Sequence, residues 1–164
     1  MPFPPVTDQF FLTVTWLGAL VVLLPTAAAL AFFLHRCSKR REALLLIVGL
    51  GLTVISVHAL KLLIKRPRPE IEHLLIPMPT SWSFPSAHAA QAAAFFFALA
   101  FIAARNLPKP VAKLTIIACL LVTLLIAYSR VYLQVHYPTD VLAGLVVGGG
   151  GVLVAAAMIM PPER

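Results

Sequence analysis

The sequence predicts an all-α integral membrane protein, a helical bundle of about five transmembrane helices. Three observations lead to this fold class. Of the 164 residues, 60% are hydrophobic and only 12% are charged, and the mean hydropathy is +0.94, which argues against a water-soluble domain. The apolar residues also gather into runs close to the roughly 20 that an α-helix needs to cross a bilayer. Because the connections are short and no repeat is visible, we expect residues 1–164 to form one membrane-embedded domain.

Five apolar runs bounded by charged residues or prolines are the expected transmembrane helices. No positively charged segment precedes the first run, so we expect a permanent span and not a cleaved signal peptide. The last run contains four consecutive glycines, which should let another helix approach closely; a flexible break is the alternative. The five expected spans are Phe10–Leu34, Ala43–Leu63, Ala87–Ala104, Val111–Tyr128 and Val141–Met160.

The Lys and Arg residues divide unevenly between the two sides that five spans define. One side, which includes Arg164, holds eight of the thirteen, and a basic excess marks the cytoplasmic side. We therefore expect a multi-pass protein of the inner (cytoplasmic) membrane, with the N-terminus outside and the C-terminus in the cytoplasm. The opposite side is predicted to carry the functional site and to face the periplasm or exterior. Its five basic residues are Lys61, Lys65, Arg66, Arg68 and Arg130.

The formal net charge of +7 would suggest a nucleic-acid partner for a soluble protein. In a membrane protein, basic residues instead mark cytoplasmic loops or contact anionic lipid headgroups. We therefore expect the lipid bilayer and no nucleic acid as partner, and the oligomeric state is left open. Cys37 lies in a basic loop and Cys119 in the middle of an apolar run, which predicts neither a disulfide nor a metal site.

The segment from Ser129 to Asp140 places charged residues between two apolar runs, where they are expensive unless they have partners and a function. If a helix opens with Pro138 in its first turn, where a missing N–H is tolerated, then His136 and Asp140 are four apart and can meet on one side. A carboxylate bonded to one imidazole nitrogen leaves the other free as an acceptor or nucleophile. Arg130 adds a planar, charged fork that matches phosphate oxygens. The segment therefore predicts phosphate chemistry.

A basic cluster from Lys61 to Pro69 ends the second apolar run. Lys61, Lys65 and Arg68 would share a face if the helix continued, but the two prolines of the cluster should end or bend it near Arg66. A lone basic cluster at a helix end more often holds lipid headgroups than a substrate. The predicted position on the outer side weakens that alternative.

A polar turn from Ser83 to His88 leads into the third apolar run. Backbone N–H groups at a helix start favour an anion, so Ser86 and the amides after it can hold phosphate oxygens, with His88 beside them. Both residues have ordinary structural alternatives. Ser86 is also a normal helix N-cap, and an interfacial histidine hydrogen-bonded to backbone is equally common.

Three motifs emerge: Lys61, six residues, Arg68-Pro69; Pro85-Ser86-Ala87-His88; and Ser129-Arg130, five residues, His136, three residues, Asp140. Together they resemble the three signature motifs of the type 2 phosphatidic acid phosphatase (PAP2) superfamily, in the family's order and spacing, over residues 61–140. Ala87 stands where the family usually has glycine, which keeps the backbone N–H but adds a Cβ at the site. Arg66-Pro67 is a second Arg-Pro pair, but the residue seven before Arg66 is Ala59, so the family spacing selects Lys61 with Arg68.

This resemblance implies that His136 attacks phosphorus and becomes phosphorylated, with Asp140 orienting and polarising it. His88 would protonate the leaving oxygen and then activate the water that hydrolyses the phosphohistidine. The arrangement requires no cofactor and no metal, and the sequence has no carboxylate cluster to hold one. The implied phosphate-binding residues, which carry the phosphoryl charge, are Lys61, Arg68, Ser86, Ala87 and Arg130.

The predicted substrate is a membrane lipid phosphate or diphosphate whose tail stays in hydrocarbon while its headgroup enters a basic pocket. For short bacterial-type members of the family, the resemblance suggests undecaprenyl diphosphate, phosphatidylglycerophosphate, phosphatidic acid or lipid A phosphates. We favour a polyprenyl diphosphate because an outer-face site suits carrier-lipid recycling. One alternative is phosphoryl transfer between two lipids, which uses the same residues. The other is a non-enzymatic lipid-binding or transport protein, which would not need two histidines and an aspartate at this spacing.

Overall fold

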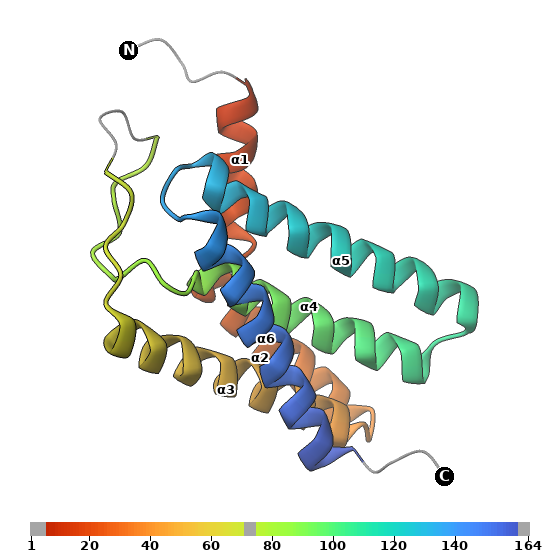
Figure 1. The fold of residues 1–164 in the computed structure, drawn as a ribbon. Coiled ribbons are helices and arrows are strands. Elements are labelled where there is room, and N and C mark those ends of the chain that lie inside the picture. The colour runs from red at the N-terminus through yellow and green to blue at the C-terminus, as the bar shows by residue number, and fades with distance from the viewer. Residues whose placement is uncertain (1–5, 71–74, 161–164) are drawn as a thin grey trace.

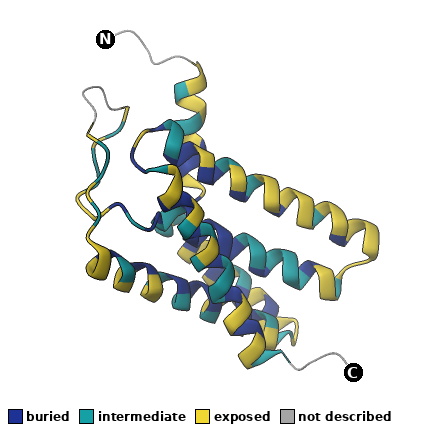
Figure 2. Cartoon of the chain, viewed as in Figure 1, coloured by how far each residue is buried: buried dark blue, intermediate teal, exposed yellow. Residues whose placement is uncertain are grey.

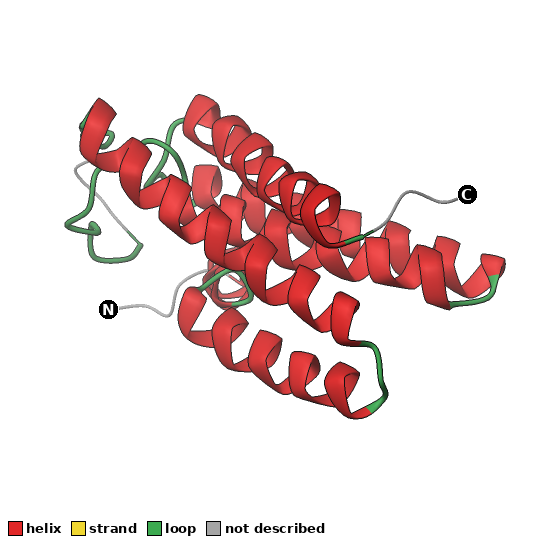
Figure 3. Cartoon of the chain, turned by 90° about the horizontal axis from the view of Figure 1, so that it is seen from below, coloured by secondary structure: helices red, strands yellow, loops and turns green. Residues whose placement is uncertain are grey.

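The computed structural model describes residues 6–70 and 75–160, so Arg164 and both extreme ends lie outside the described residues. Within these ranges the chain forms helices and no strand, as predicted (Figures 1 and 3). The helices are α1 (Val6–Trp16), α2 (Leu20–Arg36), α3 (Arg40–Ile64), α4 (Ala87–Asn106), α5 (Lys109–Tyr132) and α6 (Pro138–Ile159).

Helices α3 to α6 are each long and apolar enough to span a membrane, and α1 with α2 adds a fifth span if the pair is counted as one. The prediction of about five spans is therefore confirmed, but the first expected span is not one continuous helix, because α1 and α2 meet at a bend of 47°. Gly18 lies in the break, and a Cβ built there would lie 2.5 Å from Ile126 Cγ2 and 3.2 Å from the His88 carbonyl oxygen. The missing side chain thus lets the bend pack against the first turn of α4.

Helix α4 lies at the centre of the bundle and contacts α2, α3, α5 and α6. Its first half is rich in alanine, and small side chains let neighbouring helices approach closely. Buried residues gather on α4 and on the faces turned towards it, whereas α5 exposes its outer face (Figure 2). Large apolar side chains such as Leu62, Val146 and Leu153 are exposed on the outside of the bundle, which is the surface that a lipid-facing helix presents.

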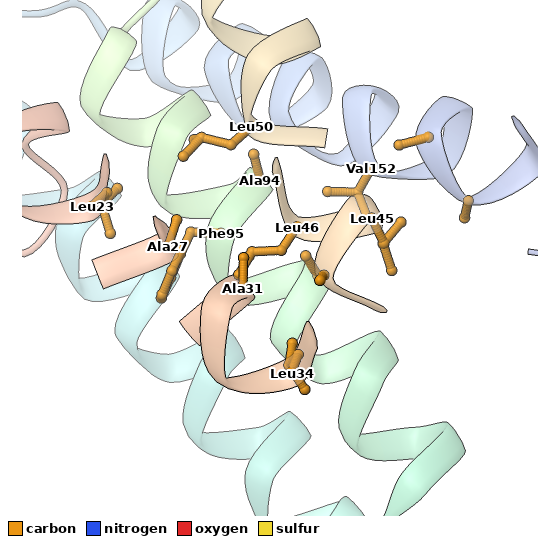
Figure 4. Packing of buried hydrophobic residues seen from close by; sticks show 14 residues of the cluster. Leu23, Ala27, Ala31, Leu34, Leu45, Leu46, Leu50, Ala94, Phe95 and Val152 are labelled. Carbon is orange, nitrogen blue, oxygen red and sulfur yellow. The ribbon is translucent and has the colours of Figure 1, made fainter. Parts of the chain in front are cut away.

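The first half of α3, the middle of α4 and the second half of α6 pack with α2 into an apolar cluster (Figure 4). We call this cluster the apolar end. Leu45 and Leu46 have no exposed surface there, and Val152 from α6 is 4% exposed. The labelled members are Leu23, Ala27, Ala31, Leu34, Leu45, Leu46, Leu50, Ala94, Phe95 and Val152.

The glycines of α6 allow close contact with two neighbouring helices. A Cβ at Gly148 would overlap the Ala90 carbonyl oxygen of α4, and a Cβ at Gly151 would overlap the Thr53 hydroxyl of α3. Nothing lies within 4 Å of a Cβ built at Gly150. The predicted close approach is confirmed, and α6 runs without a break through these positions.

Candidate active site

Helices α3 and α5 end, and α4 and α6 begin, at the same end of the bundle (Figure 1). This brings the three predicted segments together, although they are up to about 80 residues apart in the sequence. We call this region the polar end, because buried polar side chains concentrate there. They are Thr15, Lys61, Ser83, Ser86, Ser129, Arg130, His136 and Asp140.

The turn between α5 and α6 positions His136. Leu133 and Val135 anchor the turn in the interior, with 1% and 0% of their surface exposed. Between them Gln134 adopts a φ of 58°, in the left-handed region, within the turn that joins α5 to α6. The next helix then begins at Pro138, as predicted. His136 is thereby held with only 4% of its surface exposed.

Asp140 is fully buried in the first turn of α6. Its Oδ2 accepts hydrogen bonds from the Ser83 hydroxyl at 2.5 Å and the Tyr137 amide at 3.1 Å, and it lies 3.4 Å from His136 Nδ1. Its Oδ1 lies 2.9 Å from Arg66 Nη1. A carboxylate at a helix N-terminus is also stabilised by the helix dipole. The structure thus places His136 and Asp140 side by side, with both carboxylate oxygens paired.

The neighbours of His136 determine its tautomer. Arg68 Nη1 lies 3.3 Å from His136 Nε2, and a guanidinium can only donate. Nε2 therefore carries a lone pair in this arrangement, which leaves the ring proton on Nδ1, facing the acceptor Oδ2 of Asp140. A neutral imidazole with its lone pair on Nε2 is the form that can attack an electrophile.

Burial lowers the pKa of His136 from 6.5 to about 4. The hydrogen bond to Asp140 opposes this shift, and the charges of Arg68, Arg130 and Lys61 add to it. Burial likewise lowers the pKa of Arg68, with a partial offset from Asp140, but an arginine stays charged near neutrality. At pH 7 the site therefore combines a neutral imidazole with positive charge, which suits an anionic substrate.

Two of the predicted cations also hold the loop ahead of α4. Arg68 donates to the Ser81 carbonyl oxygen at 2.8 Å and to the Val135 carbonyl oxygen at 2.6 Å. Lys61 donates to the carbonyl oxygen of Trp82. Both side chains therefore tie the 81–83 loop to the ends of α3 and α5 while they contribute positive charge beside His136.

The start of α4 supplies anion-binding groups. Ala87 is the first residue of the helix, and its N–H belongs to the first turn, whose amides lack intrahelical partners. The amide of Ser86 donates to the Asp140 carbonyl oxygen at 2.9 Å and so ties the start of α4 to α6. The Ser86 hydroxyl and Arg130 Nε are buried and have no partner among the described residues. Buried donors of this kind can be satisfied by an anion's oxygens.

His88 follows in the first turn of α4 and is half-buried. It lies within electrostatic range of His136, Arg68 and Lys61, and it lines a cavity together with Arg130. Arg130 is 3% exposed and donates to the Thr15 hydroxyl at 2.5 Å. Every residue predicted for the site therefore comes from the polar end, with His88 and Arg130 at the border of an apolar cavity.

Three residues of the site were missed in the sequence. Arg66 was set aside on motif spacing, yet it pairs with Asp140. Ser83 bonds the same carboxylate, and its place in the polar turn before α4 was the available signal. Thr15 lies in the first apolar run, where nothing in the sequence marks it as the partner of Arg130.

The donor set favours an anion over a metal ion. No group of three or more His, Cys, Asp or Glu side chains in residues 6–70 and 75–160 could hold a metal. The groups that converge are instead guanidinium, ammonium, hydroxyl and backbone N–H donors, which are the usual ligands of phosphoryl oxygens.

Comparison with known proteins agrees with this geometry. The model of the PAP2 superfamily matches residues 42–163, which is most of the chain. The chain belongs to this superfamily. Among solved structures, it is similar to the PAP2-type phosphatidylglycerolphosphate phosphatase of Bacillus subtilis, with a TM-score of 0.88, 28% identity, and coverage of 99% of this chain and 81% of that one. Aquifex aeolicus LpxE is similar with a TM-score of 0.74 and 28% identity, over 95% of this chain and 88% of the other.

Curated PAP2 relatives are lipid phosphatases. Phosphatidylglycerophosphatase B of Bacillus subtilis is 32% identical over 146 residues, which are 88% of this chain and 71% of the relative. Undecaprenyl-diphosphatase of Sulfolobus acidocaldarius is 31% identical over 135 residues, which are 80% of this chain and 60% of the relative. This chain is thus shorter than either relative. With the family match and the apolar helices, these relatives identify it as a multi-pass membrane lipid phosphatase of the PAP2 superfamily.

Proposed function

We propose that this PAP2 protein removes the terminal phosphate of a lipid phosphate or diphosphate through a phosphohistidine on His136. The observation that carries the proposal is the position of His136 between two partners, with Nδ1 3.4 Å from Asp140 Oδ2 and Nε2 3.3 Å from Arg68 Nη1. Because a guanidinium can only donate, this geometry leaves the lone pair on Nε2. The unpartnered buried donors on Ser86 and Arg130 support it, since phosphoryl oxygens would satisfy them.

In the first step, Nε2 of His136 attacks phosphorus, and the bond between phosphorus and the lipid oxygen breaks as the N–P bond forms. His88 gives its proton to that leaving oxygen. The proton on Nδ1 stays in place, and the carboxylate of Asp140 stabilises the positive charge that develops on the ring, as in other carboxylate–histidine pairs. Lys61, Arg68 and Arg130 hold the charge on the phosphoryl oxygens, with the Ser86 hydroxyl and the Ala87 amide.

In the second step, water attacks the phosphohistidine. His88, which is now neutral, takes a proton from the water, and the N–P bond breaks to return its electron pair to Nε2. Inorganic phosphate leaves and the site is restored. The net reaction consumes one water and one lipid phosphate or diphosphate, and it produces inorganic phosphate together with the lipid alcohol or the lipid monophosphate, respectively.

A polyprenyl diphosphate is the substrate that we favour. The undecaprenyl-diphosphatase relative supports this choice, and so does a site on the side opposite the basic excess, which would face the exterior of the inner membrane. The Bacillus subtilis relative makes phosphatidylglycerophosphate the next candidate. Phosphatidic acid and lipid A phosphates complete the set to be compared.

The test is phosphate release by the purified protein in detergent, with chelator present, from a panel of these four lipids. Wild-type protein should release phosphate, and His136→Ala should lose activity by about a thousandfold or more, because a nucleophile is removed. Brief reaction with a ³²P-labelled substrate should also leave acid-labile, base-stable label on wild type and none on His136→Ala. His88→Gln should retain more of this label, because the second step loses its base.

Two results would count against the proposal. Phosphate release that survives in His136→Ala would exclude a phosphohistidine on this residue. Label on the protein with loss of lipid phosphate, but with the phosphate recovered on a second lipid, would identify a phosphotransferase in place of a hydrolase.

A further inference from the structure

An apolar cavity of about 400 Å³ opens beside the site, and His88 and Arg130 form part of its wall. The hydroxyl of Thr15, which accepts the hydrogen bond from Arg130, lies in the same wall. The remaining wall comes from α1, the α1–α2 break and the loop ahead of α4, and its side chains are mostly apolar. They include Leu12, Trp16, Ala19 and Ile76.

We propose that this cavity, between α1 and the loop that contains Ile76, holds the hydrocarbon chain next to the reacting phosphate. The inference rests on the proposed function, and it adds where the lipid chain lies and which residues limit its size. Continuity with the site is the first argument, because His88 and Arg130 belong to both. A phosphate held by Arg130 would therefore have apolar surface directly beside it.

The chemistry fixes the side on which the lipid leaves. In an in-line displacement the leaving oxygen lies opposite the attacking atom, here Nε2 of His136. The proton donor must lie within hydrogen-bond reach of that oxygen, and under the proposed function this donor is His88. The lipid oxygen and the first carbons of its chain therefore lie on the His88 side, where the wall changes from charged to apolar.

The cavity also reaches the surface of the bundle. Trp16 is 60% exposed while it lines the cavity, and tryptophan is enriched where helices meet the membrane interface. A chain that passes between Trp16 and the loop can stay in contact with the bilayer. A larger apolar cavity of about 470 Å³, lined by Leu52, Ala59 and Val147 among others, shares no residue with the site, so it serves as an internal control.

The experiment compares two substrates that differ only in chain length, butyl phosphate and hexadecyl phosphate. Ala19 is 7% exposed, and Ala19→Phe would fill the cavity from the α1–α2 break. We expect the ratio of kcat/KM for hexadecyl over butyl phosphate to fall by about tenfold or more, as when a hydrocarbon pocket is obstructed. Ala59→Phe makes the same change in the control cavity and should leave this ratio unchanged.

Ile76→Trp tests the same cavity from the loop ahead of α4, and it decides the question if Ala19→Phe in the α1–α2 break prevents folding. We expect the ratio to fall in this variant as well. If Ile76→Trp leaves the ratio unchanged, whether or not both substrates are hydrolysed more slowly, the assignment of the cavity to the hydrocarbon chain is overturned. If wild-type protein hydrolyses neither phosphate nor any panel lipid, the proposed function itself fails.

A separate observation concerns Arg66, which holds the carboxylate of Asp140 through the oxygen that does not face His136. Its Nη1 lies 2.9 Å from Asp140 Oδ1 and 2.7 Å from the Thr139 hydroxyl. The guanidinium also stacks over the ring of Tyr137, 4.1 Å from the ring centroid. All three contacts fall in the chain immediately after His136.

We infer that Arg66 is a positioning residue that acts on His136 through Asp140, an inference that also rests on the proposed function. Rotation of the carboxylate would break the bond of Oδ1 to Arg66 and those of Oδ2 to Ser83 and Tyr137 together. Arg66 therefore fixes the orientation in which Oδ2 meets Nδ1 of His136. Small displacements of a catalytic pair reduce turnover strongly.

The guanidinium of Arg66 contacts Tyr137, Thr139 and Asp140, so its loss should lower kcat and leave KM nearly unchanged. We expect Arg66→Met to lose about tenfold to a hundredfold in kcat and to recover part of it when guanidinium ion is added. Arg66→Lys should lie between wild type and Arg66→Met. Lys65→Met removes the neighbouring exposed cation and should change neither constant.

Three outcomes would overturn this inference once wild-type activity is established. A raised KM with unchanged kcat in Arg66→Met would mean that Arg66 binds substrate directly. Equal losses in Lys65→Met would reduce the effect to local positive charge. If Arg66→Lys is as inactive as Arg66→Met, and guanidinium ion restores no turnover to Arg66→Met, the substitutions would have disrupted the folded structure and not the positioning of His136.

Discussion

At the apolar end of the bundle, Leu45 and Leu46 are fully buried within a cluster of hydrocarbon side chains. At the polar end, Asp140, Ser83 and Ser86 are just as completely buried, yet each carries groups that water would otherwise satisfy. The polar end therefore depends on specific partners, because a buried charge without a partner is costly. The apolar end depends only on volume and shape.

This difference predicts two kinds of sensitivity along the same helices. A substitution that keeps shape but removes charge should harm the polar end, because partners are matched to the charge. A substitution that removes volume should harm the apolar end, because the neighbours cannot close the gap completely. Helices α3, α4 and α6 contribute to both ends, so each helix contains its own internal comparison.

The largest effect is expected for Asp140→Asn. The amide is nearly the same shape as the carboxylate, but it cannot stabilise the charged ring of His136, and it can present an N–H to Nδ1 and reverse the tautomer. We expect kcat to fall by about a thousandfold or more, together with a lower thermal unfolding midpoint, because Arg66, Ser83 and the Tyr137 amide lose their carboxylate acceptor. Steady-state assays on folded, purified protein check this.

An Asp140→Asn variant that retains turnover within tenfold would contradict the matched-partner interpretation of the polar end. Thr139→Val, which removes the neighbouring hydroxyl bonded by the same guanidinium, is the control. It should cost far less turnover, because among the described residues the Thr139 hydroxyl is hydrogen-bonded to Arg66 and not to His136.

Leu46→Ala should have the next largest effect, and it should act on stability and not on turnover. Leu46 is fully buried at the apolar end, so the lost packing and the residual cavity should lower the free energy of unfolding by about 2–5 kcal/mol. Leu153→Ala, a lipid-facing change on a side chain that is 69% exposed, should cost much less. Unfolding in detergent measures both, and kcat per folded molecule should stay close to wild type. A large loss of kcat in Leu46→Ala would mean that the two ends are coupled.

A smaller effect is expected when the pH is lowered, and it concerns the contribution of the buried His136 imidazole to stability. Burial lowers the pKa of His136 to about 4 from 6.5. The unfolded ring therefore takes up a proton as the pH falls below 6.5, while the folded ring stays neutral until about 4. The stability that His136 contributes is thus complete above 6.5 and falls by at most about 3 kcal/mol towards pH 4.

The measurement is the unfolding midpoint of wild type and His136→Gln between pH 4 and 7. The difference in unfolding midpoint between wild type and His136→Gln should fall as the pH is lowered from 7 to 4. The reason is that His136 titrates in the unfolded chain over this range, whereas glutamine does not titrate. Parallel curves would show that His136 has an ordinary pKa in the folded protein.

The apolar end was the more predictable of the two from sequence. The runs that became α3 to α6 were located to within four residues at either end, because spanning length and hydropathy suffice for that. The bend at Gly18 was missed, since a lone glycine in an apolar run does not show which helix packs against it. Motif spacing predicted one shared site but did not predict the hydrogen-bond partners of its residues. The residues assigned to that site were Lys61, Arg68, His88, Arg130, His136 and Asp140. Arg66, Ser83 and Thr15 are recognised only through contacts between distant segments, which no local pattern contains.

The smallest effect is expected for Ala87→Gly, which tests how closely the polar end fits its ligand. Ala87 is the first residue of α4 and is only partly buried. Glycine keeps the N–H that faces the proposed phosphate and removes the Cβ. We expect KM for lipid phosphates to fall by about threefold or less with kcat unchanged, together with a slight loss of stability, because glycine is a poorer helix former by about 1 kcal/mol or less at a helix end. A gain of more than about tenfold in kcat/KM would instead mean that the Cβ of Ala87 obstructs the reacting group, and that the polar end is shaped for a narrower headgroup than the panel lipids present.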